Sequence, residues 1–330
     1  MFLDMPIVIS YVENAYIENF NPRPNRLNAW SGPDDKYSDP VNMITGNFTW
    51  DYTDFAVYGA NPLEFTRMYN AQNSGDSEIG YNWRHNYMVA LEDTPLYAKV
   101  TMPDGYRIIF TKDIDGIYTG PTDVDMSLVS TAGGYLMTYR DNTGYRFDAG
   151  GYLVAIEPVN GDTASITRNG AQISSVSNSS GTLTFSYSGG RIDTITDQTG
   201  RSVHYSYNGS GDLAAFTNAD GDTVSYIYDN HLIKEITDFN GDTYLRNVYD
   251  DIGRVTEQYL ADQGTSYFEY NFKERWSTIK TYGGGVLIQY LKYYYDTDQR
   301  VIGVEDINGR TVYEYENGRV KKVTDCYATS

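Results

Sequence analysis

The feature that most constrains the fold of this 330-residue chain is an internal repeat of about twenty residues. Turn glycines mark the repeat at Gly161, Gly181, Gly200, Gly221 and Gly241, with successive spacings of 20, 19, 21 and 20 residues. A fixed period of this length is typical of proteins that stack one supersecondary unit many times. The chain is therefore interpreted first as an array of similar units.

The strands that follow Gly181, Gly200 and Gly221 each carry a pair of aromatic residues at positions i and i+2. After Gly200, for example, Val203, Tyr205 and Tyr207 alternate with small or polar residues. Alternation at period 2 predicts a β-strand with one aromatic face. We take these pairs as the structural aromatics of the repeat: Phe185/Tyr187, Tyr205/Tyr207, Tyr226/Tyr228, Phe268/Tyr270, Tyr293/Tyr295 and Tyr313/Tyr315.

A second segment in each unit carries apolar residues at i and i+3, a spacing that strict alternation does not explain. The segments are too short and too β-branched for a helix, so we expect a strand that bends or bulges. Each unit is then a β-hairpin closed by an Asx-rich turn, where glycine supplies the positive φ of a tight turn. The pairs are Ile192/Ile195, Leu213/Phe216, Ile233/Ile236, Trp276/Ile279, Val301/Val304 and Val320/Val323.

Composition supports an all-β protein of repetitive antiparallel hairpins. The chain holds 33 Tyr and 31 Gly and lacks the Ala, Leu, Glu and Lys runs that long helices need. Because a lone hairpin is marginal in water, neighbouring units must share a continuous sheet. The formal charge of −19 disfavours a nucleic-acid partner. No run approaches the roughly 18 apolar residues of a membrane span.

The sequence predicts no enzyme, cofactor or metal site. The three histidines, His85, His204 and His231, are far apart and lack ligand neighbours at metal-binding spacing. Ser210 lies between two glycines, but no helix follows it, as a nucleophile elbow requires. The Asx-Gly turns at 218–222 and 238–242 lack the first and twelfth ligands of an EF-hand, so weak adventitious calcium is the remaining metal alternative.

Two motifs resemble known family signatures. The segment Gly200–Tyr207, followed by a turn and a hydrophobic half-strand, resembles the YD repeat of RHS (rearrangement hotspot) proteins, which are related to teneurins and to the B and C components of Tc toxins. Residues 39–48 resemble the motif that opens the RHS core, and Arg67–Asn70 with Gly80–Tyr87 resemble its next block, where Tyr81 replaces the usual Gly. The resemblance covers residues 38–325.

The resemblance implies a spiralling antiparallel sheet that forms part of a hollow β-shell around a C-terminal polymorphic toxin or other cargo. The pattern along the chain predicts an extended lead-in (1–38), a non-repetitive β region that corresponds to the opening of the core (39–95), and a repeat array (96–330), which by the resemblance is truncated at its C-terminal end. The implied partners are further YD repeats and the cargo, and the implied location is the bacterial surface or the secreted fraction.

The expected function is that of a structural wall segment without catalysis. The alternative is a tyrosine-rich carbohydrate-binding or adhesion module, because tyrosine rings stack on sugars. Truncation of the array would also leave an unpaired edge strand at Thr311–Tyr315, and unprotected edges recruit partners, so self-association through that edge is expected.

Overall fold

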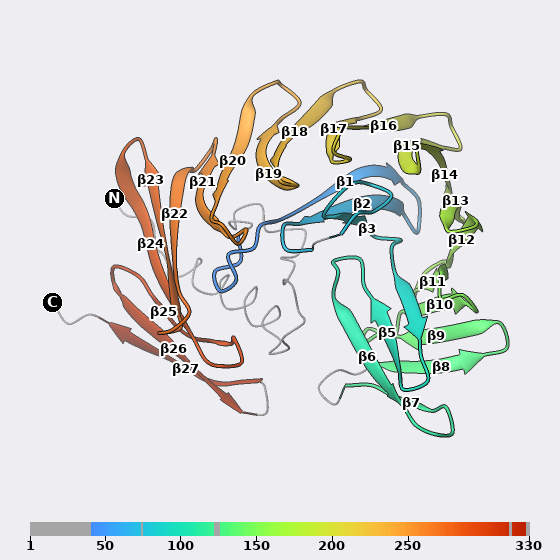
Figure 1. The fold of residues 1–330 in the computed structure, drawn as a ribbon, viewed down its shortest axis with the longest axis horizontal. Coiled ribbons are helices and arrows are strands. Elements are labelled where there is room, and N and C mark those ends of the chain that lie inside the picture. Colours follow the sequence, from blue (N-terminus) through green and yellow to red (C-terminus); the bar gives the residue numbers. More distant parts are fainter. Residues whose placement is uncertain (1–40, 74, 122–125, 317–318, 328–330) are drawn as a thin grey trace. The chain divides into compact units, whose positions relative to one another are not determined.

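A computed structural model describes residues 41–73, 75–121, 126–316 and 319–327 of the chain (Figure 1). The expected lead-in over residues 1–38 lies outside the described residues. Within them the secondary structure consists of antiparallel strands without any helix, which confirms the all-β prediction. The chain divides into two compact units: unit 1 comprises Met1–Trp50, Asn70–Gln72 and Ile227–Ser330, and unit 2 comprises Asp51–Tyr69 and Asn73–Tyr226. No helix of the described part could cross a bilayer.

Unit 2 contains two small sheets that precede the repeats. The three opening strands are β1 (Thr49–Val57), β2 (Leu63–Asn70) and β3 (Trp83–His85), in the order β1-β2-β3. A four-stranded sheet follows with β4 (Ala90–Asp93), β5 (Tyr97–Thr101), β6 (Arg107–Lys112) and β7 (Tyr118–Thr119). The expected division near residue 95 therefore falls between β4 and β5, which pair with each other.

The repeat strands of unit 2 pair in chain order, each antiparallel to the next. The last of them, β18, contains the division between the two units. The bounds of these strands are β8 (Ser127–Thr131), β9 (Gly134–Thr138), β10 (Gly144–Asp148), β11 (Leu153–Glu157), β12 (Ala164–Asn169), β13 (Gln172–Asn178), β14 (Gly181–Ser188), β15 (Arg191–Asp197), β16 (Ser202–Tyr207), β17 (Leu213–Thr217) and β18 (Thr223–Asp229).

Unit 1 continues the same hairpin pattern. Its strands again pair in chain order. Their bounds are β19 (Leu232–Thr237), β20 (Thr243–Tyr249), β21 (Val255–Leu260), β22 (Gly264–Asn271), β23 (Trp276–Gly283), β24 (Val286–Tyr295), β25 (Val301–Glu305), β26 (Gly309–Glu316) and β27 (Arg319–Tyr327).

A β-bulge explains the i,i+3 apolar pairs. In the β14–β15 ladder Ser186 faces Thr194 and Tyr187 faces Ile192, so Asp193 is the extra residue. The extra residue shifts the alternation of side chains by one position. Ile192 and Ile195, three residues apart, therefore point to the same face of the sheet, and both are fully buried. The same shift recurs with extra residues at Val154, Ser174, Ala214, Thr256, Ile302 and Lys321.

The prediction that the strand bends or bulges between Trp276 and Ile279 is wrong. The β22–β23 ladder runs from Thr265 opposite Tyr282 to Asn271 opposite Trp276 without a register shift. Along this regular strand Ile279 shares a face with Ser277 and Thr281, and all three are buried. Trp276 therefore points to the opposite face, and its spacing from Ile279 has no structural meaning.

Five-residue Asx turns close many of the hairpins. In the turn that begins at Asp197, the Oδ1 atom accepts hydrogen bonds from the backbone amides of Thr199 (2.8 Å) and Arg201 (3.1 Å). Burial works against the charge, but hydrogen bonds from Thr199 and Arg201 lower the pKa of Asp197 to about 2. The same Oδ1 pattern recurs in the turns that begin at Asp148, Asn208, Asn218, Asp238, Asp250 and Asp296.

The turn glycines do not all share one conformation. Gly200, Gly221 and Gly241 occupy the fourth turn position with φ of +89°, +93° and +84°. Gly181 begins a strand with φ of +153°, and Gly161 has no positive φ. The sequence period thus combines glycines with different backbone roles.

The expected free edge at Thr311–Tyr315 is also wrong. These residues lie in β26, where Thr311 faces Val304 of β25 and Asp325 of β27. The edge that was expected to be free therefore pairs with β27 along the whole segment, and on the other side β25 pairs with Arg310–Val312.

Candidate functional site: the buried contact between the opening strands and the repeats

The first aromatic of each predicted pair is a core residue. Phe185, Tyr205, Tyr226, Phe268, Tyr293 and Tyr313 are 3–7% exposed. The second aromatic is half-buried in most pairs: Tyr187, Tyr207, Tyr228, Tyr270 and Tyr315 are intermediate, and Tyr295 is buried. The period-2 alternation therefore separates a core position from a position at the edge of the core.

Five tyrosines each join a hairpin to the one before it. The Tyr207 hydroxyl donates to the carbonyl of Ile192 at 2.6 Å, and Ile192 is the second residue of the preceding bulged strand β15. Tyr187 makes the reverse contact and accepts from the Ile173 amide at 3.1 Å. The donor contact recurs from Tyr249 to Ile233, from Tyr270 to Val255 and from Tyr315 to Val301, at 2.7–2.8 Å. We call these contacts the tyrosine stitches.

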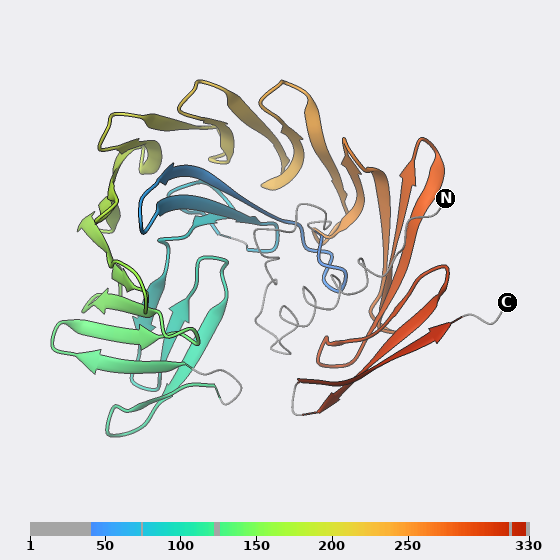
Figure 2. The same ribbon diagram turned by 180° about the vertical axis from the view of Figure 1, so that it is seen from behind.

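In unit 2 the first aromatics pack against the opening strands β1–β3, which lie beside the hairpins β14 to β18 in both views (Figures 1 and 2). Phe65 of β2 contacts the rings of Phe185 and Tyr205, with centroids 5.7 and 6.0 Å apart. Trp83 of β3 contacts Tyr226 at 5.5 Å. These rings form one apolar core between the opening strands and the repeats.

A charged pair lies inside this core. Arg67 is fully buried, and its Nε atom donates to Oδ2 of the buried Asp54 at 2.6 Å. The same carboxylate oxygen accepts from the Tyr205 hydroxyl at 2.8 Å. The guanidinium also lies 4.8 Å from the Trp83 ring centroid and 4.9 Å from that of Phe216. Arg67 is thus held by one ion pair and by a cage of aromatic rings.

Burial and pairing act in opposite directions on these charges. Burial alone would lower the pKa of Arg67, but the adjacent Asp54 carboxylate raises it above its ordinary value. Burial raises the pKa of Asp54, and the contacts with Arg67 and Tyr205 oppose that rise. Arg67 therefore keeps its positive charge. The Asp54 carboxylate depends on that charge, because without it burial would favour the protonated carboxyl group.

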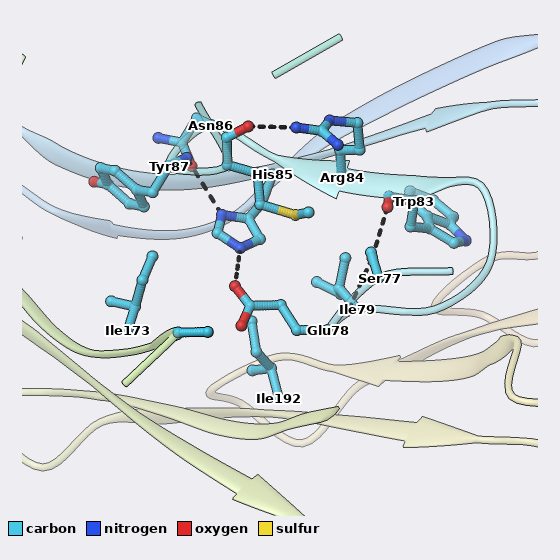
Figure 3. A network of polar contacts seen from close by, with 12 residues as sticks. Ser77, Glu78, Ile79, Trp83, Arg84, His85, Asn86, Tyr87, Ile173 and Ile192 are labelled. Carbon is cyan, nitrogen blue, oxygen red and sulfur yellow. Dashed lines mark hydrogen bonds and ion pairs between the residues drawn. The ribbon is translucent and has the colours of Figure 1, made fainter. Parts of the chain in front are cut away.

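A second polar pair, between a buried histidine and a half-buried glutamate, lies in the same region (Figure 3). The Nε2 atom of His85 lies 2.8 Å from Oε1 of Glu78, and the Nδ1 atom accepts from the Tyr87 amide at 3.3 Å. Burial lowers the pKa of His85. Burial works to raise the pKa of Glu78, but the hydrogen bond from His85 leaves it below its ordinary value. A neutral imidazole that donates from Nε2 to the carboxylate satisfies both shifts.

The loop before β3 is fixed to the repeats by its backbone. The Ile192 amide donates to the Glu78 carbonyl at 2.7 Å, and the Arg191 guanidinium donates to the Ser77 carbonyl at 2.6 Å. Gly80 has φ of +108°, and a Cβ atom there would lie 2.9 Å from the Leu213 amide nitrogen. Only glycine therefore allows the loop to approach β17 this closely.

The polar groups around His85 fit a structural role better than a catalytic one. Both ring nitrogens of His85 are engaged, one by Glu78 and one by its own backbone, so neither is available to a substrate. His204 lies near Thr194, with 3.0 Å between Nδ1 and Oγ1. Among the described residues no three acidic, His or Cys side chains form a group that could hold a metal ion.

Asp54, Arg67 and Glu78 were not predicted from the sequence as partners in buried pairs. One signal was available: Leu63, Phe65, Arg67 and Tyr69 follow period 2 and are all buried, so an arginine interrupts an apolar strand face. A charge on such a face implies a buried partner. The sequence could not identify Asp54 as that partner.

Two family models match the chain. A model described as a domain of unknown function (DUF6531) matches residues 38–110, which include the opening strands. A model described as the RHS repeat matches residues 207–243, which include β17, β18 and β19.

Two curated relatives match this chain, each over a small part of its own length. The tRNA nuclease WapA of Bacillus subtilis strain 168 is 28% identical over 319 residues, which cover 87% of this chain and 12% of the relative. The tRNA3(Ser)-specific nuclease WapA of Bacillus spizizenii is 30% identical over 115 residues, 34% of this chain and 5% of the relative. The chain therefore spans a small fraction of the proteins that it matches.

Solved Tc toxin structures are also similar. The complex TcdB2-TccC3 without its hypervariable C-terminal region has a TM-score of 0.41 and 10% identity, covering 81% of this chain and 19% of that chain. The Photorhabdus luminescens Tc holotoxin pore has a TM-score of 0.40 and 11% identity, covering 76% of this chain and 17% of that chain.

Proposed function

Because this chain is a protein of the RHS/YD-repeat family, we propose that it forms a stretch of wall in an RHS-type shell that encloses a C-terminal toxin or another cargo. The observation that carries the proposal is the tyrosine stitch. Each stitch joins a hairpin to the preceding hairpin at the same point of the repeat, as between Tyr207 and Ile192. Hairpins linked in this way extend as one sheet, which is what a wall requires.

The opening strands support a wall rather than a sugar-binding surface. A ring that stacks on a sugar must be accessible, but the first aromatics of the repeats are 3–7% exposed. In unit 2, Phe65 and Trp83 cover three of them. We therefore assign the first aromatic residues of the repeats to the core and propose no glycan partner.

We further propose that this chain has no catalytic activity and that any nuclease activity belongs to the cargo. The relatives that match it are named as tRNA nucleases, and this chain spans only 12% of the length of the first of them. A wall that surrounds a toxin would act outside the producing cell, so we also propose that the protein is secreted or displayed at the surface.

Protease protection tests the wall function. The complete gene product is incubated with a nonspecific protease in buffer and in a urea concentration that unfolds the repeats. Under this proposal the cargo survives in buffer and is digested in urea. Digestion in buffer at the rate of the isolated cargo would contradict the proposal.

A nuclease assay tests the absence of catalysis. This chain alone is incubated with tRNA beside the complete gene product. We expect no cleavage by this chain. Cleavage that disappears in a Glu78→Gln or His85→Gln variant would show that the buried pair is catalytic.

A further inference from the structure

One residue of the loop before β3 is bonded to two different sheets. The backbone carbonyl of Glu78 accepts from the Ile192 amide of β15 at 2.7 Å. The side chain of Glu78 reaches β3, where its Oε1 atom lies 2.8 Å from Nε2 of His85 (Figure 3). Glu78 therefore joins the opening strands to the repeats, and a change that weakens its bond to His85 loosens that connection.

The hydrogen bonds of His85 fix its ring in the neutral form. The Nδ1 atom accepts from the Tyr87 amide at 3.3 Å and so carries no proton, and Nε2 then donates to the Glu78 carboxylate. A second proton on the ring would lie on Nδ1 and face the N–H group of Tyr87. The imidazolium therefore cannot form in this arrangement without breaking the contact with Tyr87.

The groups around His85 also oppose a positive charge on the ring. The ring is fully buried, and its centroid lies 4.9 Å from that of the Phe65 ring in β2. Two cations act on the ring, Arg84 from β3 and Arg168 from β12, against the single carboxylate of Glu78. Because burial and the two arginines outweigh the carboxylate, the pKa of His85 lies below its ordinary value.

Acid also acts on the other partner of the pair. The side chain of Glu78 is 17% exposed, and besides His85 it interacts with Tyr187 of β14 and Arg168 of β12. Burial works to raise the pKa of Glu78, but the hydrogen bond from His85 leaves that pKa below its ordinary value. The paired arrangement thus favours a neutral His85 and an ionised Glu78, and both groups bind protons more readily once they separate.

We propose that His85 and Glu78 form an acid-sensitive latch, which holds the loop of residues 75–82 on the repeats at neutral pH and releases it in acid. The contribution of His85 is complete above the pKa of an exposed histidine, about 6.5, and is lost as the pH falls toward the lower pKa of the buried ring. Protonation of Glu78 adds to the release below about pH 4.5. The inference does not depend on the proposed wall function.

Hydrogen exchange measured by mass spectrometry at pH 7.5 and pH 5.5 tests the latch on the full chain. Exchange of the urea-unfolded chain at each pH corrects for the pH dependence of the intrinsic rate. The corrected exchange of peptides from residues 75–87 should be about tenfold faster at pH 5.5, because only the open state gains the histidine proton. Unchanged exchange would overturn the proposal, and so would slower exchange, since it would mean that an imidazolium strengthens the bond to Glu78.

Three variants separate the roles of the two partners. The variant His85→Gln keeps an amide that can donate to Glu78 but has no group that titrates, so its exchange should not depend on pH between 7.5 and 5.5. The variant Glu78→Gln should exchange faster at both pH values and keep the rise at pH 5.5, because His85 still gains its proton on opening. The matched control is His204→Gln, which removes an exposed histidine of β16 and should behave as the unmodified chain does. A rise at pH 5.5 that persists unchanged in His85→Gln would refute the latch.

Nitrogen-15 NMR of the histidine rings provides a readout that does not depend on the stability of the His85 variant. The chain has three histidines, and the variants His204→Gln and His231→Gln identify the other two signals. In the folded chain His85 should keep a neutral ring with its proton on Nε2 at pH 5.5. An imidazolium signal from His85 at this pH, together with slow exchange of residues 75–87, would overturn the proposal.

Discussion

The buried ion pair between Arg67 and Asp54 gives the sharpest prediction about stability. The variant Arg67→Met keeps an unbranched apolar side chain in the aromatic cage but removes the charge. It leaves the Asp54 carboxylate buried and deprived of its cationic partner, since the 2.6 Å contact is lost. Breaking a buried pair by removing one partner costs about 3–5 kcal/mol. We therefore expect the local opening equilibrium of the opening strands to rise by about two to four orders of magnitude.

Hydrogen exchange measured by mass spectrometry on peptides from β2 reads this opening directly. The control is Arg246→Met, because Arg246 is 57% exposed in its pair with Glu235 and a surface pair contributes about 0–1 kcal/mol. Exchange in β2 should accelerate in the Arg67 variant and remain nearly unchanged in the control.

The pH dependence of the Arg67→Met variant tests the physical reason. Burial raises the pKa of Asp54, and without Arg67 the rise is larger. A raised carboxyl pKa means that the folded state favours the protonated form, so the loss of stability should be greatest at neutral pH and smaller as the pH falls toward 5. A loss below about 1 kcal/mol at pH 7, or an equal loss at pH 5, would refute the argument.

Three further predictions concern the stitches and turns. Tyr207→Phe removes the hydroxyl that binds the preceding hairpin and should cost about 1 kcal/mol in urea unfolding, whereas Tyr58→Phe, at an 80% exposed position, should cost nothing measurable. Because the pKa of Asp197 is lowered to about 2, its contribution of about 1–2 kcal/mol should be present above pH 4 and be lost as the pH falls toward 2, and the Asp197→Asn variant should lack this acid transition. Gly241→Ala should cost about 1 kcal/mol by thermal unfolding, because φ is +84° and the added methyl group meets no atom within 4 Å.

The repeat could be predicted from the sequence because local chemistry sets it. Alternation of aromatic and polar residues at period 2 specifies a strand and its buried face, so the sequence alone places Tyr205 and Tyr226 on the buried faces of their strands. The i,i+3 spacing likewise specified bulges, since two buried residues three apart cannot share a face of a regular strand. The same reasoning failed at Trp276 and Ile279, where a matching spacing lies on a strand without a bulge.

The partners of buried charges could not be predicted in this way. Arg67 interrupts an apolar face, which signals a buried cation, but Asp54 lies 13 residues away on another strand and Tyr205 lies in a distant repeat. His85 and Glu78 are seven residues apart and meet because the backbone of the intervening loop is fixed to β15 and β17. Such pairs depend on how two sheets pack, which no local pattern encodes.

The sequence by itself thus determined the unit of this protein: a twenty-residue hairpin with one aromatic face, a bulge and an Asx turn. These properties follow from backbone geometry and side-chain periodicity within a single unit. The tertiary structure decided which surfaces the units use. It buried Phe185, Tyr205 and Tyr226 against the opening strands and enclosed an arginine among aromatic rings. Those outcomes depend on contacts between sheets, which exist only once the chain has folded.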